Sequence, residues 1–162
     1  MLCLMKKSMQ KRLQKRQNNL PGMFVDSSVF LELLLGQPKH EECLSFFNRA
    51  RYKYRLAASV LALGEVMNTL STIEDANAKE KSLIWFSDLL DDEKIAVCPI
   101  SRICLKNNVT LMESDEYLDS HDALIFSSAV TENFETLVTL DSDFTKQTGN
   151  LWHVKLKRPK DA

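Results

Sequence analysis

The sequence lacks any long run of apolar residues. No stretch approaches the roughly 18 consecutive apolar residues that a membrane-spanning helix needs, although 44% of the 162 residues are hydrophobic. The start of the chain, MLCLMKKSMQKRLQKRQNN, does not resemble a secretory signal, because basic residues interrupt every apolar segment. We therefore expect a protein without a membrane partner and a cytoplasmic location.

The cysteines and histidines lack the spacing of a zinc site. The four cysteines form no C-x-x-C pair, and the three histidines are scattered along the chain. Nothing in the spacing of Cys3, Cys43, Cys98 and Cys104 supports disulfides. We expect reduced thiols, with Cys98 a small core residue inside an apolar run.

Positive charge is distributed unevenly. The net charge of −1 conceals six basic residues and no acid within residues 1–22, whereas the other 140 residues carry 15 basic and 22 acidic residues. The basic arm either contacts nucleic acid or is a disordered, variable extension. The second interpretation is favoured, because Pro21 and Gly22 mark a sharp boundary. We expect an extension at 1–22, one domain at 23–158 and a short tail at 159–162.

Short apolar runs alternate with segments of helical periodicity along this domain. The runs predict strands at 23–25, 55–58, 94–98, 136–140 and 154–156. The periodic segments predict helices at 29–35, after Pro38, and at 60–71, 76–91, 101–115 and 121–131. Ser27 or Ser28, Ser59 and Ser120 are the expected N-caps, and residues 107–110 are weak helix formers.

Most of the predicted strands have no polar face. Such strands, alternating with helices, are typical of a parallel sheet covered on both sides. The predicted fold is therefore an α/β protein, a three-layer α/β/α sandwich around a short, mainly parallel sheet. In such sheets ligands bind beyond the carboxyl ends of the strands, so the acids at those ends matter most.

Two predicted strands end in an aspartate. Asp26 follows Phe24 and Val25, and Asp141 follows the run at 136–140. Each has a purely structural alternative, because Asp26 is also a good helix N-cap and Asp141 a good turn residue. Neighbouring parallel strands would present both carboxylates to one crevice, with Asp143 two residues further on.

Two further acids lie on helices. Glu65 falls at the edge of an apolar stripe, where it either joins the crevice or reaches back to water. Asp122 precedes Ile125 and Phe126 by three and four residues, so its carboxylate lies on the face that must be buried. The first turn of a helix stabilises an anion by only about 0.3–1 kcal/mol, far less than the several kcal/mol that its desolvation costs.

Asp122 therefore needs a cation, yet no Lys or Arg occurs between positions 107 and 145. Several carboxylates sharing one crevice repel each other unless a divalent ion neutralises them. Hard oxygen ligands select Mg²⁺ or Mn²⁺ over zinc. Such sites support the hydrolysis of phosphodiester bonds.

Four segments together resemble the PIN-domain family, which includes VapC-type toxins and RNA-processing nucleases. They are Phe24-Val25-Asp26-Ser27-Ser28, Gly64-Glu65-Val66, the stretch DSHDAL at 119–124 and the stretch LVTLDSDF at 137–144. The resemblance extends from residue 23 to about 145, with the acids in the order that the family shows.

The resemblance implies roles for individual residues. Asp26, Glu65, Asp122 and Asp141 would be the catalytic quartet that binds Mg²⁺ or Mn²⁺, with Asp143 as an auxiliary metal-binding acid. Ser28 and Thr139 would orient these carboxylates by hydrogen bonding. The implied function is a divalent-metal-dependent endoribonuclease that hydrolyses RNA, and the family further implies a homodimer and, for a toxin, an antitoxin partner.

Two other functions are kept open. The first is a catalytically inactive PIN-like protein that binds RNA or serves as a scaffold; the intact quartet argues against it. The second is a phosphatase of the haloacid-dehalogenase type, which also places an Asp after its first strand. That class needs a second Asp two residues later, where this chain has Ser28.

Overall fold

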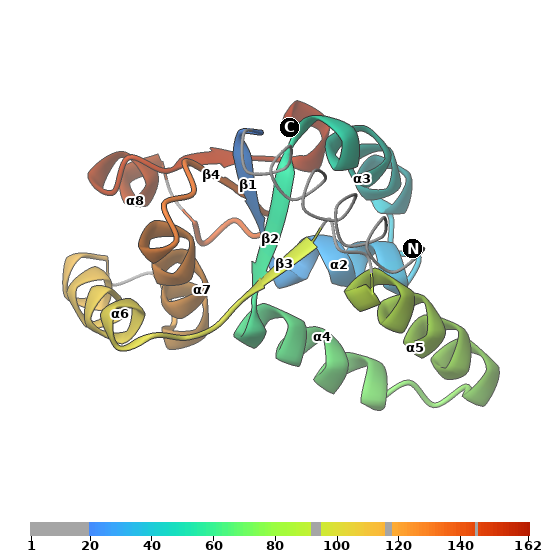
Figure 1. Ribbon diagram of the computed structural model, residues 1–162. Coiled ribbons are helices and arrows are strands. Elements are labelled where there is room, and N and C mark those ends of the chain that lie inside the picture. Colours follow the sequence, from blue (N-terminus) through green and yellow to red (C-terminus); the bar gives the residue numbers. More distant parts are fainter. Residues whose placement is uncertain (1–19, 92–94, 116–117, 145) are drawn as a thin grey trace, which may run out of the picture.

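The computed structural model describes residues 20–91, 95–115, 118–144 and 146–162. Within them, five strands form one sheet in the order β3-β2-β1-β4-β5 (Figure 1). All four neighbouring pairs are parallel. The strands are β1 (Gly22–Val25), β2 (Arg55–Ser59), β3 (Ile95–Cys98), β4 (Thr136–Val138) and β5 (Lys155–Lys157).

Helices cover both faces of this sheet. They are α2 (Ser27–Leu34), α3 (His40–Lys53), α4 (Val60–Ser71), α5 (Ala76–Asp91), α6 (Arg102–Ser114), α7 (Ser120–Thr131), α8 (Lys146–Leu151) and the 3₁₀ helix η1 (Pro159–Asp161). In Figure 1, α2, α3 and α5 lie on one side and α6 and α7 on the other. The predicted α/β/α sandwich is confirmed. None of the described helices is long and apolar enough to span a membrane.

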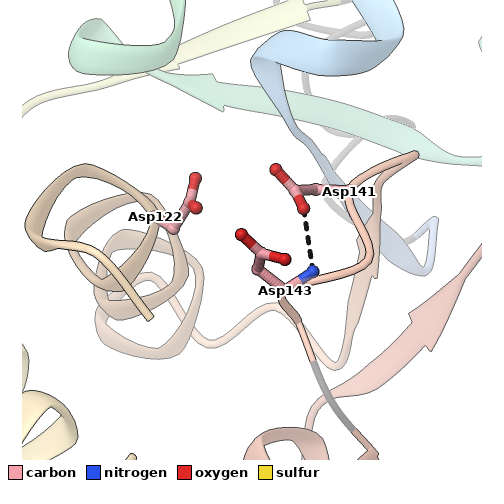
Figure 2. Close-up of side chains that lie close together, drawn as sticks. All are labelled: Asp122, Asp141 and Asp143. Carbon is pink, nitrogen blue, oxygen red and sulfur yellow. Dashed lines mark hydrogen bonds between the residues drawn. The ribbon is translucent and has the colours of Figure 1, made fainter. Parts of the chain in front are cut away.

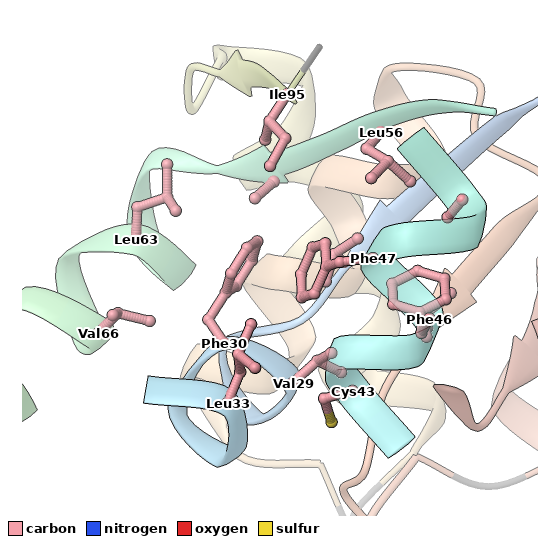
Figure 3. Packing of buried hydrophobic residues seen from close by; sticks show 14 of the residues in the cluster. Val29, Phe30, Leu33, Cys43, Phe46, Phe47, Leu56, Leu63, Val66 and Ile95 are labelled. Atoms are coloured by element: carbon pink, nitrogen blue, oxygen red, sulfur yellow. The ribbon is translucent and has the colours of Figure 1, made fainter. Parts of the chain in front are cut away.

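Alternate residues of the central strands supply the two cores. Met23 and Val25 face the core under α2 and α3, whereas Phe24 faces the core under α6 and α7. The first core interlocks Phe30 of α2 with Phe47 of α3, their ring centroids 5.4 Å apart (Figure 3). Because α2 is buried in this way, the turn between β1 and α2 has a fixed position.

The predicted N-cap of α7 is wrong, and for α2 the structure decides between the two alternatives that the sequence left open. Asp119, not Ser120, caps α7 by accepting hydrogen bonds from the amides of His121 and Asp122 at 2.7 and 2.9 Å. Asp26, not one of the serines, caps α2 by accepting from the amide of Ser27. In both cases the aspartate has the extended backbone of a cap, and the serine already belongs to the first helical turn. Ser59 caps α4 as predicted.

The end of the chain is more structured than the sequence indicates. A helix, α8, precedes β5, and η1 occupies the predicted tail, with Pro159 buried. The carbonyl of Pro159 accepts a hydrogen bond from Arg49 of α3 at 3.3 Å. Helix α6 also continues without a break through residues 107–110, because packing overrides the weak propensity of that segment.

Cys43, Cys98 and Cys104 are free and buried, as expected for reduced thiols. Cys3 and the basic residues of the predicted N-terminal extension lie outside the described part of the chain, which begins at residue 20.

Candidate metal centre

The site forms where β1 and β4 end side by side. Val25 pairs with Val138 across the two strands, so the next residues, Asp26 and Thr139, emerge together. The amide of Asp26 still donates to the carbonyl of Val138 at 3.0 Å. This register places the turn after β1 against the loop after β4, although the two are more than 110 residues apart in sequence.

Asp26 is the most deeply buried acid of the site, with 2% of its surface exposed. Its Oδ2 accepts hydrogen bonds from the hydroxyls of Ser28 at 2.5 Å and Thr139 at 2.7 Å. Its Oδ1 accepts from the amide of Ser27 at 2.8 Å. Burial raises the pKa of Asp26, and these hydrogen bonds offset part of that rise.

The same two hydroxyls bind the loop after β4. Ser28 Oγ accepts from the amide of Leu140 at 3.0 Å, and Thr139 Oγ1 accepts from the amide of Asp141 at 2.9 Å. The carboxylate of Asp141 in turn accepts from the amide of Asp143 at 2.8 Å. Hydrogen bonds therefore link the backbone of both acidic loop residues to the buried carboxylate of Asp26.

Asp122 approaches this loop from α7. Carboxylate oxygens of Asp122, Asp141 and Asp143 lie within 4.8 Å of one another. Figure 2 shows the three side chains directed toward a common space between the helix and the loop. Asp122 and Asp141 are half-buried and Asp143 is exposed, so the group opens to solvent on one side.

Glu65 enters from α4 and is half-buried. Burial raises its pKa, while a hydrogen bond from the Ser27 side chain lowers it. The negative charge of Asp26 also raises the pKa of Glu65. Asp26 and Glu65 therefore lie outside the closest group of three carboxylates but within its electrostatic reach.

The electrostatic cost of the arrangement is concentrated on Asp122. Burial and then the charges of four other carboxylates raise its pKa from 3.8 to about 7; those acids are Asp119, Asp141, Asp26 and Glu65. The charges that raise this pKa come from three loops and one helix, so the fold itself gathers acids that repel one another. Asp119, which the sequence alone did not single out, is the largest of these contributors.

The residues fit a hard divalent ion. Two oxygens bound to one Mg²⁺ at 2.0–2.1 Å lie at most about 4.2 Å apart, so the group of three carboxylates needs little contraction. All donors are carboxylate oxygens, the ligands that Mg²⁺ and Mn²⁺ prefer. An ion at this place would relieve the repulsion that raises the pKa of Asp122.

A parallel sheet with acids after two of its central strands, joined by acids from two helices, defines an α/β protein with an acidic site. The sequence profile of the PIN domain matches residues 23–150, and the chain belongs to that family. No curated protein sequence matches this chain at a significant level.

Solved structures of the same fold come from bacterial toxin–antitoxin systems. VapBC2 from Rickettsia felis, bound to a DNA fragment, is 18% identical, with a TM-score of 0.64 over 84% of this chain and 97% of that one. A toxin–antitoxin complex from Klebsiella pneumoniae is 19% identical, with a TM-score of 0.62 over 87% of this chain and 99% of that one. The sarcin-ricin loop cleaving toxin VapC20 from Mycobacterium tuberculosis is 15% identical, with a TM-score of 0.63 over 75% of this chain and 92% of that one. At these identities the similarity establishes a shared fold.

Proposed function

We propose that this PIN-domain protein is a divalent-metal-dependent endoribonuclease. The observation that carries the proposal is the convergence of Asp122, Asp141 and Asp143 within 4.8 Å, beside two further acids. A fold gains no stability from gathering repelling carboxylates in this way, so the arrangement is best explained by a cation that it binds.

In this proposal Asp122, Asp141 and Asp143 hold Mg²⁺ or Mn²⁺ directly, and Asp26 and Glu65 complete the acidic site. When bound, the ion supplies Lewis-acid stabilisation of the charge that develops on the phosphate during hydrolysis. Ser28 and Thr139 keep Asp26 and the loop of Asp141 in register by the hydrogen bonds described above. The half-buried Asp122 gives up its proton near neutral pH, which prepares it to bind a cation.

Cleavage of a fluorescently labelled single-stranded RNA tests this function. The wild-type protein should cleave with Mn²⁺ or Mg²⁺ and stop in EDTA, and Asp122→Asn should lose the activity. Glu132→Gln is a matched control, because Glu132 is an exposed acid at the far end of the same helix. Unchanged cleavage by Asp122→Asn would remove the site from the mechanism. RNA binding without cleavage under any of these ions would favour the inactive scaffold instead.

We further propose that the chain acts as the toxin of a toxin–antitoxin pair. The proposal is supported by the solved complexes of the same fold. A groove of about 250 Å³ between α3 and α5, lined in part by Leu44, Phe47 and Trp85, offers apolar surface to an antitoxin segment. Co-expression with the product of a short adjacent reading frame should yield a complex, and Trp85→Glu should break it. A homodimer remains a prediction that sedimentation would test.

A further inference from the structure

A cleft of about 310 Å³ adjoins the acidic site on the side of β5. Its lining includes Thr139 and Asp141 of the site, together with Lys157, Arg158 and a second acid, Asp161. The cleft therefore holds two cations beside the acidic site, in a domain whose residues after position 22 carry a net negative charge.

The sheet register fixes Lys157 beside the site. Lys157 is the last residue of β5 and pairs with Val138, and its carbonyl accepts a hydrogen bond from the amide of Thr139 at 3.0 Å. Its side chain is half-buried, yet within the described parts of the chain its ammonium has no hydrogen bond or ion pair. An ammonium that no neighbouring group binds keeps its three N–H donors for a ligand in the cleft.

Arg158 is held in place by the site itself. Its Nη1 donates to the carbonyl of Thr139 at 3.2 Å, and the hydroxyl of the same threonine binds Asp26. A guanidinium has five N–H donors in a planar fork that matches phosphate oxygens. One contact to the backbone therefore orients the fork and leaves most of its donors for a ligand in the cleft.

An alternative role for the two cations is to neutralise the acidic site. The charges that shift the pKa of Asp122 do not support it, because all of them are carboxylates and all raise that pKa. The charges acting on Asp26 include no cation either. Lys157 and Arg158 are thus not among the charges that shift the pKa of Asp122 or Asp26.

We propose that this cleft is a phosphate subsite, in which Lys157 and Arg158 bind a backbone phosphate adjoining the scissile one on single-stranded RNA. The inference rests on the proposed ribonuclease function. Backbone phosphates are the groups that Lys and Arg contact independently of sequence, and such contacts set the register of a strand. The subsite would hold the strand so that its next phosphate reaches Asp122 and Asp141.

Lys157→Gln tests the subsite, with Lys155→Gln as its matched control. Lys155 belongs to the same strand and carries the same charge, but it is exposed and does not line the cleft. Both variants are made in an Asp122→Asn background, and binding of a labelled single-stranded oligonucleotide is followed by fluorescence anisotropy at several salt concentrations. Lys157→Gln should weaken binding on the order of tenfold and lower the salt slope by about 0.7, the value for one phosphate contact on a single strand.

The subsite predicts equal losses on RNAs of unrelated sequence, since no base is read. Equal effects of Lys157→Gln and Lys155→Gln would overturn it, because binding would then reflect overall charge alone. Arg158→Lys keeps the charge but removes the fork, and it should also weaken binding while thermal unfolding confirms that the variant is folded. Competition by inorganic phosphate as strong as that by a trinucleotide would likewise contradict a strand-binding subsite.

Failure of the subsite and failure of the ribonuclease proposal are distinguishable. If the wild-type protein cleaves RNA and Lys157→Gln has the same KM and kcat, the subsite proposal fails and the ribonuclease proposal stands. If the wild-type protein binds RNA without cleaving it, and Lys157→Gln weakens that binding, the subsite proposal stands and the ribonuclease proposal fails.

Discussion

The hydroxyl of Thr139 donates a hydrogen bond to Asp26 Oδ2 at 2.7 Å, across two strands that end together. The Oγ1 atom of Thr139 also accepts a hydrogen bond from the amide of Asp141 at 2.9 Å. Because one hydroxyl serves both residues, the buried acid and the loop acid cannot shift independently. Thr139 therefore fastens the loop of Asp141 and Asp143 to the turn after β1.

Replacing Thr139 with valine should destabilise the protein and reduce its activity. Valine removes a donor from a buried carboxylate and an acceptor from the amide of Asp141, and leaving such groups unsatisfied costs about 1–3 kcal/mol. Urea denaturation measures the loss. Thr110→Val is the control, because Thr110 is exposed on α6, and it should change stability by no more than about 0.5 kcal/mol. Equal losses in the two variants would mean that the hydroxyl of Thr139 has no special role.

Ser28 and Thr139 should act as one unit. Each donates to Asp26 Oδ2 and each accepts from an amide of the loop after β4. A double-mutant cycle of Ser28→Ala and Thr139→Val should therefore give a coupling energy of at least about 0.5 kcal/mol. Additive effects would indicate two independent hydrogen bonds and would contradict a shared network.

The stability of the metal-free protein should fall as the pH rises. Asp122 titrates near 3.8 when unfolded and at about 7 in the fold, so the native state binds this proton more tightly between these values. Stability consequently declines from about pH 4 to pH 7. Asp26 and Glu65, whose pKa values are also raised by burial, act in the same direction.

Denaturation in EDTA at several pH values measures this decline. An aspartate in the unfolded chain has a pKa of about 4, so it is ionised there above pH 5. The side chain that replaces it in Asp122→Asn cannot ionise. The stability of Asp122→Asn should therefore depend less steeply on pH between 5 and 7 than that of the wild type. Glu113→Gln, which changes an exposed acid of α6, should keep the wild-type slope. The same slope in Asp122→Asn would mean that this residue does not titrate as its surroundings imply.

Local patterns were enough to predict the strands, most of the helices and the sandwich. Strand ends are visible in a sequence because an apolar run stops at a polar residue, as at Asp26. Caps were harder: Asp119 and Ser120 are both good N-caps, and only the backbone geometry decides between them.

Contacts between distant segments were not accessible from periodicity. The pairing of Ser28 with the amide of Leu140 depends on the register between β1 and β4. The position of Lys157 depends on one further register, between β4 and β5. Neither leaves a local signal, although the resemblance to PIN domains did point to Ser28 and Thr139. The role of the acids as metal ligands stays a prediction.

Metal binding should stabilise the protein without any substrate. An ion that binds only the folded state at a hundredfold excess over its Kd adds about 2.7 kcal/mol. For a chain of this size each kcal/mol raises Tm by roughly 2–4 °C. Mn²⁺ and Mg²⁺ should therefore raise the Tm measured by calorimetry, and EDTA should reverse the shift.

The variants decide which carboxylates bind the ion. Asp141→Asn should lose the metal-induced rise in Tm, because it removes one of the three carboxylates that lie within 4.8 Å of one another. Asp88→Asn should keep the rise, since Asp88 is exposed on α5, away from the site. A rise that persists in Asp141→Asn would place the ion elsewhere. A rise lost in Asp141→Asn but kept in Asp26→Asn would exclude Asp26 as a ligand and leave it the role of organising the loop of Asp141 and Asp143, two of the acids in Figure 2.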